Sequence, residues 1–206
     1  RLGRLDDAFR LLDLAERTAR HQGWEASAAR ALFSRGLILT EAGRYRDSVP
    51  AYEQAIAEYE RLGGVVSLLN ALFNISSNQV ALGDYSDALA TSERGTARAE
   101  AARAEGNASP YDVGEQVLRQ GVALKHLGRY DDALAVYSHA LTLYEEDGST
   151  ASLRRIATVR NRQAEIQKER GLYRDARAAY EAVRGAFAAL ADTEGAADAF
   201  DELGFV

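Results

Sequence analysis

Large aromatic residues recur seven positions apart in three stretches of this chain. Seven residues make about two turns of an α-helix, so the members of each set lie on the same side of a helix. A stripe of this kind could line a binding site, but a buried seam between neighbouring helices explains it better, and we expect these rings in the core. The sets are Tyr45, Tyr52 and Tyr59; Tyr130, Tyr137 and Tyr144; and Tyr173, Tyr180 and Phe187.

A glycine-containing motif begins each of these stretches and occurs five times in the chain. Glycine adopts the left-handed conformation that ends a helix at little cost, so each motif predicts a helix end followed by a tight turn. An aspartate soon after the glycine falls in the first turn of the next helix, where we expect it to cap free N–H groups. The motifs are LGRLDDA (2–8), AGRYRDS (42–48), LGDYSDA (82–88), LGRYDDA (127–133) and RGLYRDA (170–176), whose glycines, Gly3, Gly43, Gly83, Gly128 and Gly171, lie 40, 40, 45 and 43 residues apart.

The repeating unit is therefore a pair of antiparallel helices, called here the first and the second helix of each pair. An alanine or serine five positions after the turn glycine permits the two helices to approach closely. In one repeat Ser92 and Ala99 replace the aromatic residues of the stripe, and we expect that second helix to be thinly packed. About ten helices are predicted, over residues 5–21, 24–42, 46–62, 65–82, 86–105, 111–127, 131–147, 150–170, 174–191 and 194–205.

This motif resembles the tetratricopeptide repeat (TPR), which combines a Leu-Gly pair on its first helix with Gly-x-Tyr and Ala on its second. Gly36 and Gly121 lie seven positions before Gly43 and Gly128, where the family has the glycine of the first helix. HEAT repeats share the period but lack this turn. The period of 40 to 45 residues exceeds the usual ~34 and resembles the long variety found in kinesin light chains and in the TPR arms of bacterial regulators. The resemblance implies an all-α fold, a right-handed α-solenoid of stacked antiparallel helix pairs.

The repeat register predicts one array that is cut inside a repeat at both ends. The chain contains no methionine, and we expect it to be a piece of a longer protein. Apolar residues at a cut end, such as Phe200 and Leu203, could contact another copy, so self-association through the exposed repeat ends is a further expectation. The array spans 1–206, with a partial repeat at 1–23, repeats at 24–64, 65–107, 108–148 and 149–192, and a partial repeat at 193–206.

Composition argues against several classes of function. The net charge is −6 and no basic run stands out, which disfavours nucleic acid as a partner. No apolar run approaches the ~18 residues of a membrane span and no signal peptide is evident, so we expect no membrane association and a cytoplasmic protein. Twenty-three arginines against two lysines, with abundant alanine and glycine, indicate a GC-rich bacterial genome.

Catalytic and metal-binding patterns are absent from the sequence. The lack of cysteine excludes disulfides, thiolate metal sites and cysteine nucleophiles. His21, His126 and His139 do not have the spacing of a metal site, and no glycine-rich loop carries the Gly-Lys-Ser/Thr of a phosphate-binding loop. We therefore expect no enzymatic activity, no metal and no cofactor.

The resemblance implies that the first helices line a concave groove, which is the usual binding surface of such arrays. The implied groove positions lie thirteen, ten, nine, six and three residues before each turn glycine. They hold Arg30, Phe33, Ser34, Leu37 and Thr40; Asn70, Phe73, Asn74, Ser77 and Val80; Glu115, Leu118, Arg119, Val122 and Lys125; and Thr158, Asn161, Arg162, Glu165 and Lys168. The Lys and Asn with which the best-known TPR sites clamp a C-terminal carboxylate, ten and six before the glycine, are missing here.

The groove positions combine an apolar floor, amides and cations, which suits an extended peptide. An amide side chain can donate to and accept from a ligand backbone at once, although asparagine at such positions can also serve only for capping or solvation. We take as candidate ligand-binding residues Arg30, Phe33, Leu37, Asn70, Phe73, Asn74, Ser77, Arg119, Lys125, Asn161, Arg162 and Lys168.

The predicted function is a non-catalytic module that binds a protein or peptide segment, as the sensing or regulatory part of a larger bacterial protein. A structural spacer or oligomerisation arm without a groove ligand is the alternative. Register also separates three asparagines of the stretch NALFNISSN (70–78). Asn70 and Asn74 take groove positions, whereas Asn78 lies five residues before Gly83, faces a neighbouring helix and needs an internal hydrogen-bond partner.

Overall fold

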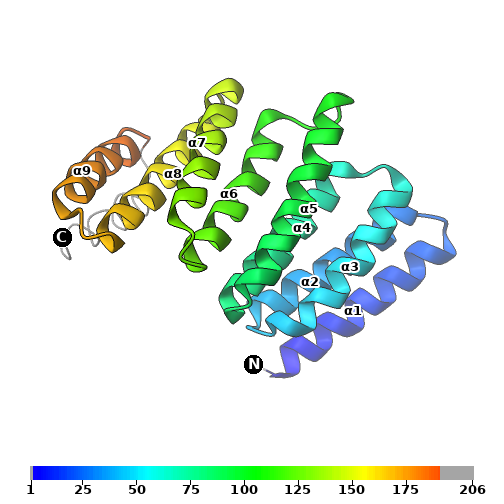
Figure 1. The fold of residues 1–206 in the computed structure, drawn as a ribbon. Coiled ribbons are helices and arrows are strands. Elements are labelled where there is room, and N and C mark those ends of the chain that lie inside the picture. The colour runs from blue at the N-terminus through cyan, green and yellow to red at the C-terminus, as the bar shows by residue number, and fades with distance from the viewer. Residues whose placement is uncertain (1, 191–206) are drawn as a thin grey trace. The chain divides into compact units, whose positions relative to one another are not determined.

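The computed structural model of the chain describes residues 2–190, and every regular element in that part is an α-helix (Figure 1). The first nine predicted helices are present, each with ends within three residues of the predicted ones, and the tenth, at 194–205, lies outside the described residues. The helices are α1 (Leu2–His21), α2 (Glu25–Glu41), α3 (Tyr45–Leu62), α4 (Val65–Leu82), α5 (Tyr85–Ala104), α6 (Pro110–His126), α7 (Tyr130–Asp147), α8 (Thr150–Glu169) and α9 (Tyr173–Ala189).

The helices belong to two compact units, Arg1–Ala108 and Ser109–Val206. In the first unit each helix from α1 to α5 packs against the next, and in the second the same holds from α6 to α9. Short turns join these neighbours, so each unit is a stack of antiparallel helix pairs, as Figure 1 shows. The fold class is therefore the predicted one, whereas a single array over the whole chain stays a prediction.

The turn within each pair is closed by two backbone hydrogen bonds around a left-handed glycine. At Gly43, whose φ is +72°, the glycine N–H donates to the Thr40 carbonyl at 2.9 Å and the Arg44 N–H donates to the Leu39 carbonyl at 2.8 Å. The same pair of bonds closes the turns at Gly83, Gly128 and Gly171. These bonds satisfy carbonyl groups at the helix end that would otherwise lack partners.

The aspartates after these turns do not cap the second helices as expected. The residues at the cap positions, Arg44, Asp84, Arg129 and Leu172, make no side-chain cap hydrogen bond. Asp47 instead accepts from Arg44 Nε at 2.7 Å, and Asp132 from Arg129 Nε at 2.8 Å. An acidic side chain still lies in the first turn of the second helices α3, α5, α7 and α9, where it complements the helix dipole.

Small residues on the first helices lie against the aromatic rings of the second. A Cβ at Gly36 would lie 2.5 Å from Tyr52 Cε1, and a Cβ at Gly121 would lie 2.4 Å from Tyr137 Cε1. Both rings are completely buried, and in the last described pair Ala164 packs against the buried ring of Tyr180. The predicted core role is thus confirmed for the second and third members of each set, whereas Tyr45 and Tyr130 are half-buried and Tyr173, at the start of α9, is 55% exposed.

The pair formed by α4 and α5 reverses this distribution of large and small residues. The buried positions of α5 are Ala88, Ser92, Gly95, Ala99 and Ala102, while α4 buries Leu68, Leu69, Leu72 and Ile75. The bulk that an aromatic ring supplies elsewhere therefore comes from the first helix of this pair. A hollow of about 350 Å³ beside α5, floored by Leu68 and Leu72, agrees with the thin packing expected there.

Helix α4 is also the one helix among the described residues that is long and apolar enough to cross a membrane by length and composition, with a mean hydropathy of 1.2. It packs between α3 and α5, and Leu68, Leu69, Leu72 and Ile75 are buried, whereas Val66 is 46% exposed and Phe73 is half-buried.

The contact between Gly121 and Tyr137 can be tested by adding one methyl group. Gly121→Ala should lower the free energy of unfolding by about 1–3 kcal/mol, because the new Cβ overpacks a buried ring. Gly185→Ala is the matched control: it lies inside α9 with nothing within 4 Å of a new Cβ, so alanine should raise the free energy of unfolding by up to ~1 kcal/mol. Urea unfolding followed by circular dichroism measures both, and equal effects of the two substitutions would contradict this account.

Candidate functional site

The candidate ligand-binding residues lie on the first helices of the pairs, α2 and α4 in the first unit and α6 and α8 in the second. Gly43, Gly83, Gly128 and Gly171 end the first helices as predicted, so each set falls along its helix with the predicted spacing. The turn predicted at Gly3 was wrong, because Gly3 lies inside α1. In the second unit α6 and α8 are in contact, and Lys125 and Glu165 at their groove positions form an ion pair. The candidate residues of the two units differ in chemistry.

In the first unit the candidate face combines partly exposed apolar residues with polar ones. Phe33, Leu37 and Phe73 are half-buried, so part of each side chain remains accessible to a ligand. The Phe33 ring meets Tyr52 edge-on, with ring centroids 5.5 Å apart. Arg30 and Asn70 are exposed beside them. This face can therefore bury apolar ligand groups next to hydrogen-bonding ones.

Two polar side chains of α4 on this face bond back to their own helix. Asn74 Nδ2 donates to the Asn70 carbonyl at 2.7 Å, and Ser77 Oγ donates to the Phe73 carbonyl at 2.8 Å. The Asn74 bond uses one of the two N–H donors of its amide. It also fixes the orientation of the amide, which stays half-buried as the register requires.

Asn78 has the internal partners that its position was predicted to need. It is 3% exposed, and its Nδ2 donates to Thr40 Oγ1 and to Ser48 Oγ, both at 2.7 Å. Thr40 Oγ1 also lies 3.2 Å from the Tyr52 hydroxyl. One amide of α4 is thereby tied to α2 and to α3, and it belongs to the scaffold of the first unit.

In the second unit the candidate face of α6 and α8 carries a cluster of charges. Glu165 Oε2 accepts from Lys125 Nζ at 2.5 Å and Glu165 Oε1 accepts from Arg162 Nη1 at 2.6 Å, so one carboxylate holds two cations. The Lys125 and Glu165 side chains are only 10% and 11% exposed, whereas Arg162 is 41% exposed. Removing one partner of a buried ion pair destabilises the fold, because the remaining charge is left buried without a counter-ion.

A second carboxylate on the same face, Glu115, joins three helices. It accepts from the Tyr144 hydroxyl at 2.8 Å and from Arg155 Nη2 at 2.6 Å, linking α6 to α7 and α8. Burial, and next the negative charge of Glu115, raise the pKa of Tyr144. Burial lowers the pKa of Arg155, but the Glu115 charge and a hydrogen bond with Tyr111 outweigh it, so the net pKa shift is upward. Both neighbours therefore keep their protons at neutral pH.

Arg119 lies between these two carboxylate clusters on α6. Burial is the main cause that lowers the pKa of Arg119, partly offset by the Glu115 charge. A guanidinium pKa starts so high that Arg119 remains a cation. Lys168 and Asn161 are half-buried on α8, and the Asn161 Oδ1 is buried with no hydrogen-bond partner among the described residues.

Two implied groove positions of the second unit are not available to a ligand. Leu118 is 1% exposed and Val122 is 9% exposed, whereas Phe33 and Leu37, at the same register of α2, are half-buried. The apolar floor predicted from the first unit therefore does not extend to α6. Polar and charged side chains make up the accessible part of that face.

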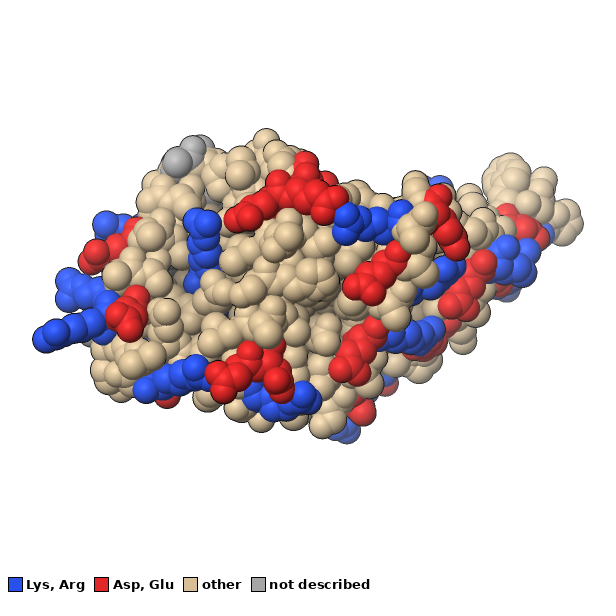
Figure 2. Space-filling view, turned by 45° about the horizontal axis from the view of Figure 1, so that its top comes forward, with Lys and Arg blue, Asp and Glu red and all other residues tan. Residues whose placement is uncertain are grey.

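Charges of both signs are mixed over the surface that Figure 2 shows, without a large area of a single sign. The surface in this view therefore lacks the broad basic footprint expected for a nucleic-acid interface. Within residues 2–190 no group of three or more His, Asp or Glu side chains is placed to hold a metal ion.

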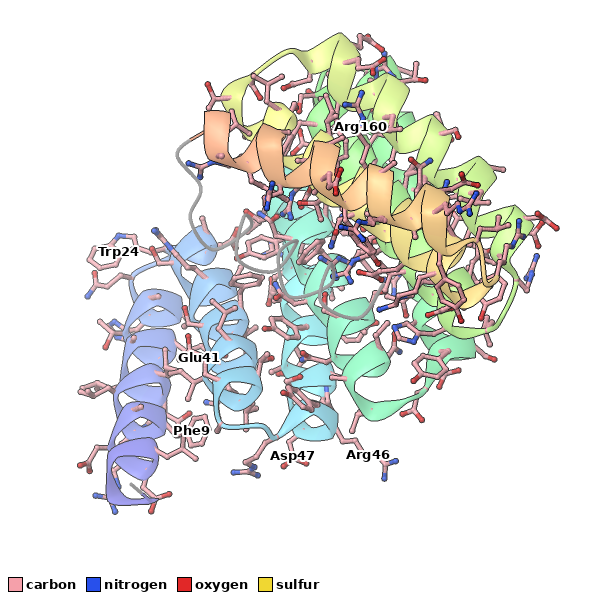
Figure 3. All side chains as sticks on the ribbon, turned by 90° about the vertical axis from the view of Figure 1, so that its left-hand side faces the viewer. Phe9, Trp24, Glu41, Arg46, Asp47 and Arg160 are labelled. Carbon is pink, nitrogen blue, oxygen red and sulfur yellow. The ribbon has the colours of Figure 1, made fainter. Side chains whose placement is uncertain are left out.

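A hollow that the sequence did not indicate lies among α1, α2 and α3. Its volume is about 580 Å³, and Phe9, Arg35, Pro50 and Asp47 are among its lining residues. Arg35 pairs with Asp13 and lies over the Phe9 ring, 5.7 Å from its centroid, and Figure 3 shows Phe9 pointing from α1 toward α2. The sequence contained one sign of this hollow. Arg35 lies eight residues before Gly43, and the same position before Gly83 holds the buried, apolar Ile75.

The different roles of Asn78 and Asn70 can be separated by stability measurements. Asn78→Ala should lower the free energy of unfolding by about 1–3 kcal/mol, because it removes two buried hydrogen bonds. Asn70→Ala is the control on the same helix: its side chain is exposed, and the change should stay within about 0.5 kcal/mol. Chemical unfolding of both variants checks this, and an Asn78→Ala protein as stable as the wild type would remove Asn78 from the scaffold.

Comparison with protein families gives two matches to models described as tetratricopeptide repeat, over residues 27–101 and 118–147. Together they cover just over half of the chain and include helices of both units. No protein of curated function matches the sequence significantly.

Several solved structures share the fold. Aspartyl phosphate phosphatase F from Bacillus subtilis matches with a TM-score of 0.78 at 17% identity, over 96% of this chain and 51% of its own. A Rap protein in complex with Competence and Sporulation Factor matches with a TM-score of 0.67 at 16% identity, over 98% of this chain and 60% of its own. A putative kinesin light chain of Podospora anserina with TPR-like repeats matches with a TM-score of 0.66 at 14% identity, over 90% of this chain and 88% of its own.

Proposed function

The chain belongs to the tetratricopeptide repeat family, and from that premise we propose that it is a non-catalytic module that binds an extended protein or peptide segment. The segment lies along the first helices of the pairs. The module serves as the sensing or regulatory part of a larger bacterial protein in the cytoplasm.

One observation carries this proposal: α2 and α4 keep apolar and amide side chains accessible on one face. Helices whose role is only structural bury their large apolar residues and expose charged ones. Here Phe33, Leu37 and Phe73 remain partly exposed on the helices that also carry Asn70 and Asn74. Apolar pockets next to a few fixed hydrogen-bonding groups are the usual composition of a peptide site.

The similar structures support the same class of function. One of them is a Rap protein solved with Competence and Sporulation Factor bound to it. The present chain spans 51% of the length of the phosphatase structure and 60% of that of the Rap protein structure, and identities of 17% and 16% show a shared fold alone. Peptide binding by this chain is therefore a proposal that its own surface residues must carry.

The candidate residues of each unit offer a different kind of contact. In the first unit Phe33, Leu37 and Phe73 receive apolar side chains of a ligand, beside the polar Arg30, Asn70, Asn74 and Ser77. In the second unit polar and charged residues bind backbone and charged groups; they are Arg119, Lys125, Asn161, Arg162 and Lys168. Amides bind peptide backbone without selecting its sequence, so the apolar and cationic residues set the selectivity.

The proposal is tested with peptides selected from a random library on the wild-type chain. Replacing Asn74 and Arg119 together by alanine should weaken a selected peptide at least tenfold, because a hydrogen bond to a charged group is worth about 1.5–3 kcal/mol. Fluorescence anisotropy with a labelled peptide gives the dissociation constants.

A double variant away from the proposed face serves as the control. Arg46, shown in Figure 3 near the start of α3, and Asn107 are both exposed and lie off the first helices. Their replacement by alanine should leave the affinity within twofold. Equal affinities of the two double variants, with melting curves that show both folded, would refute binding along the first helices.

Oligomerisation through α1 is a second candidate function that one observation favours. Leu11 is 67% exposed and Leu14 is 58% exposed on α1. Ala15 is exposed as well, although its counterparts twelve residues after the other turn glycines, among them Ala55 and Ala140, are fully buried. The α1 face therefore has the composition of a helix-packing surface.

This second function predicts a self-associating chain. Light scattering after gel filtration at about 100 µM should give a mass above that of one chain, and Leu11→Lys with Leu14→Lys should return it to one chain. Leu153→Lys, at a 47% exposed leucine on α8, is the control and should change nothing. A wild-type chain that is monomeric at this concentration would exclude oligomerisation through α1.

A further inference from the structure

The Glu165 carboxylate occupies a groove position at which no other described first helix has a charge. Six residues before their turn glycines the other first helices have Leu37, Ser77 and Val122. Glu165 is nevertheless 8% exposed as a residue and is held by two cations, Lys125 from α6 and Arg162 from its own helix. Burying a carboxylate without a partner is costly, and the two cations offset that cost.

The cations of this face outnumber its carboxylates. The ten groove positions of the second unit hold Arg119, Lys125, Arg162 and Lys168 against Glu115 and Glu165, in a chain whose net charge is −6. Among the ten groove positions of the first unit only Arg30 is charged. The positive charge of the groove positions is therefore concentrated on α6 and α8, where a ligand with several carboxylates would be attracted.

We propose that Glu165 is an internal stand-in for a ligand carboxylate: it occupies the cation pair of Lys125 and Arg162 until an acidic segment of the bound peptide takes its place. This inference rests on the proposed peptide-binding function and specifies the ligand as acidic where it crosses α6 and α8. Glu165 sets selectivity here, because only a ligand that brings its own negative charge can compete with it.

The exposure of the three side chains gives the order of contact. Arg162 is 41% exposed and is reached first from solvent, while Lys125 lies behind it at 10% exposure. The three groups together carry one net positive charge, so an incoming carboxylate is attracted before Glu165 has moved. Exchange of one carboxylate for another keeps Lys125 paired throughout, which avoids leaving a buried cation without a counter-ion.

The inference is tested with an eight-residue oligoglutamate and, as the neutral probe, an eight-residue oligoglutamine. Titration calorimetry at pH 7 and 50 mM salt should show that Glu165→Gln binds oligoglutamate about tenfold more tightly than the wild type does, because the internal competitor is gone. Affinity for oligoglutamine should be unchanged. Glu145→Gln, at an exposed glutamate of α7, is the matched control and should bind as the wild type does.

Arg162→Gln provides a second variant, since Glu165→Gln could unfold the unit by leaving Lys125 unpaired. It retains the pair of Lys125 and Glu165. It should bind oligoglutamate at least fivefold more weakly than the wild type and show a smaller loss of affinity between 50 and 300 mM salt.

A folded Glu165→Gln protein that binds oligoglutamate no more tightly than the wild type overturns the inference. So does an Arg162→Gln protein with unchanged affinity, or a complete lack of oligoglutamate binding by wild type and variants. These results leave the broader peptide-binding proposal standing if library-selected peptides still depend on Asn74 and Arg119. If the selected peptides bind independently of Asn74 and Arg119 while Glu165→Gln binds oligoglutamate more tightly, the broader proposal is refuted. The inference that Glu165 competes with acidic ligands for Lys125 and Arg162 then stands.

Discussion

The close contact between a small residue of one helix and a large residue of its partner is the constraint on which the helix pairs depend. A ring such as Tyr52 can be completely buried only because Gly36 has no side chain where the ring lies. The contact directs the aromatic stripe of the second helix inward, against one side of the first helix. Other positions of the first helix hold the candidate residues, although Phe33 among them still meets the Tyr52 ring edge-on.

How far the sequence could be interpreted depended on whether a feature is local. Helix ends could be predicted to within three residues because each turn needs a left-handed glycine, and that need acts on one residue at a time. The size of each core residue was harder to predict, because packing depends on the combined volume of the two residues that face each other across a helix pair. In the pair of α6 and α7 the first helix has the small Gly114 and the second the large Tyr144, whereas in the pair of α4 and α5 the first helix has the large Leu69 and the second the small Ala99. The fold is the same in both pairs.

Side-chain partners were beyond the reach of the sequence because they join residues about 40 positions apart. Lys125 and Glu165 each occupy a position that register assigns to the groove, and nothing local indicates that they pair with each other. The same limit explains Leu118 and Val122, whose burial depends on what packs over α6. Register predicted the internal role of Asn78, since it depends on which side of α4 faces α2 and α3, but it could not name Thr40 and Ser48 as its partners.

The groove positions of the two units differ in chemistry on the same scaffold. In α2 and α4 they are mainly apolar or uncharged polar residues, and α6 and α8 hold six of the seven charged ones. Charged positions bring a requirement that apolar ones do not have: a cation as buried as Lys125 must have a counter-ion whether or not a ligand is bound. In the second unit Glu165 supplies that counter-ion, so under the proposed exchange the affinity for an acidic ligand is the difference between two ion pairs.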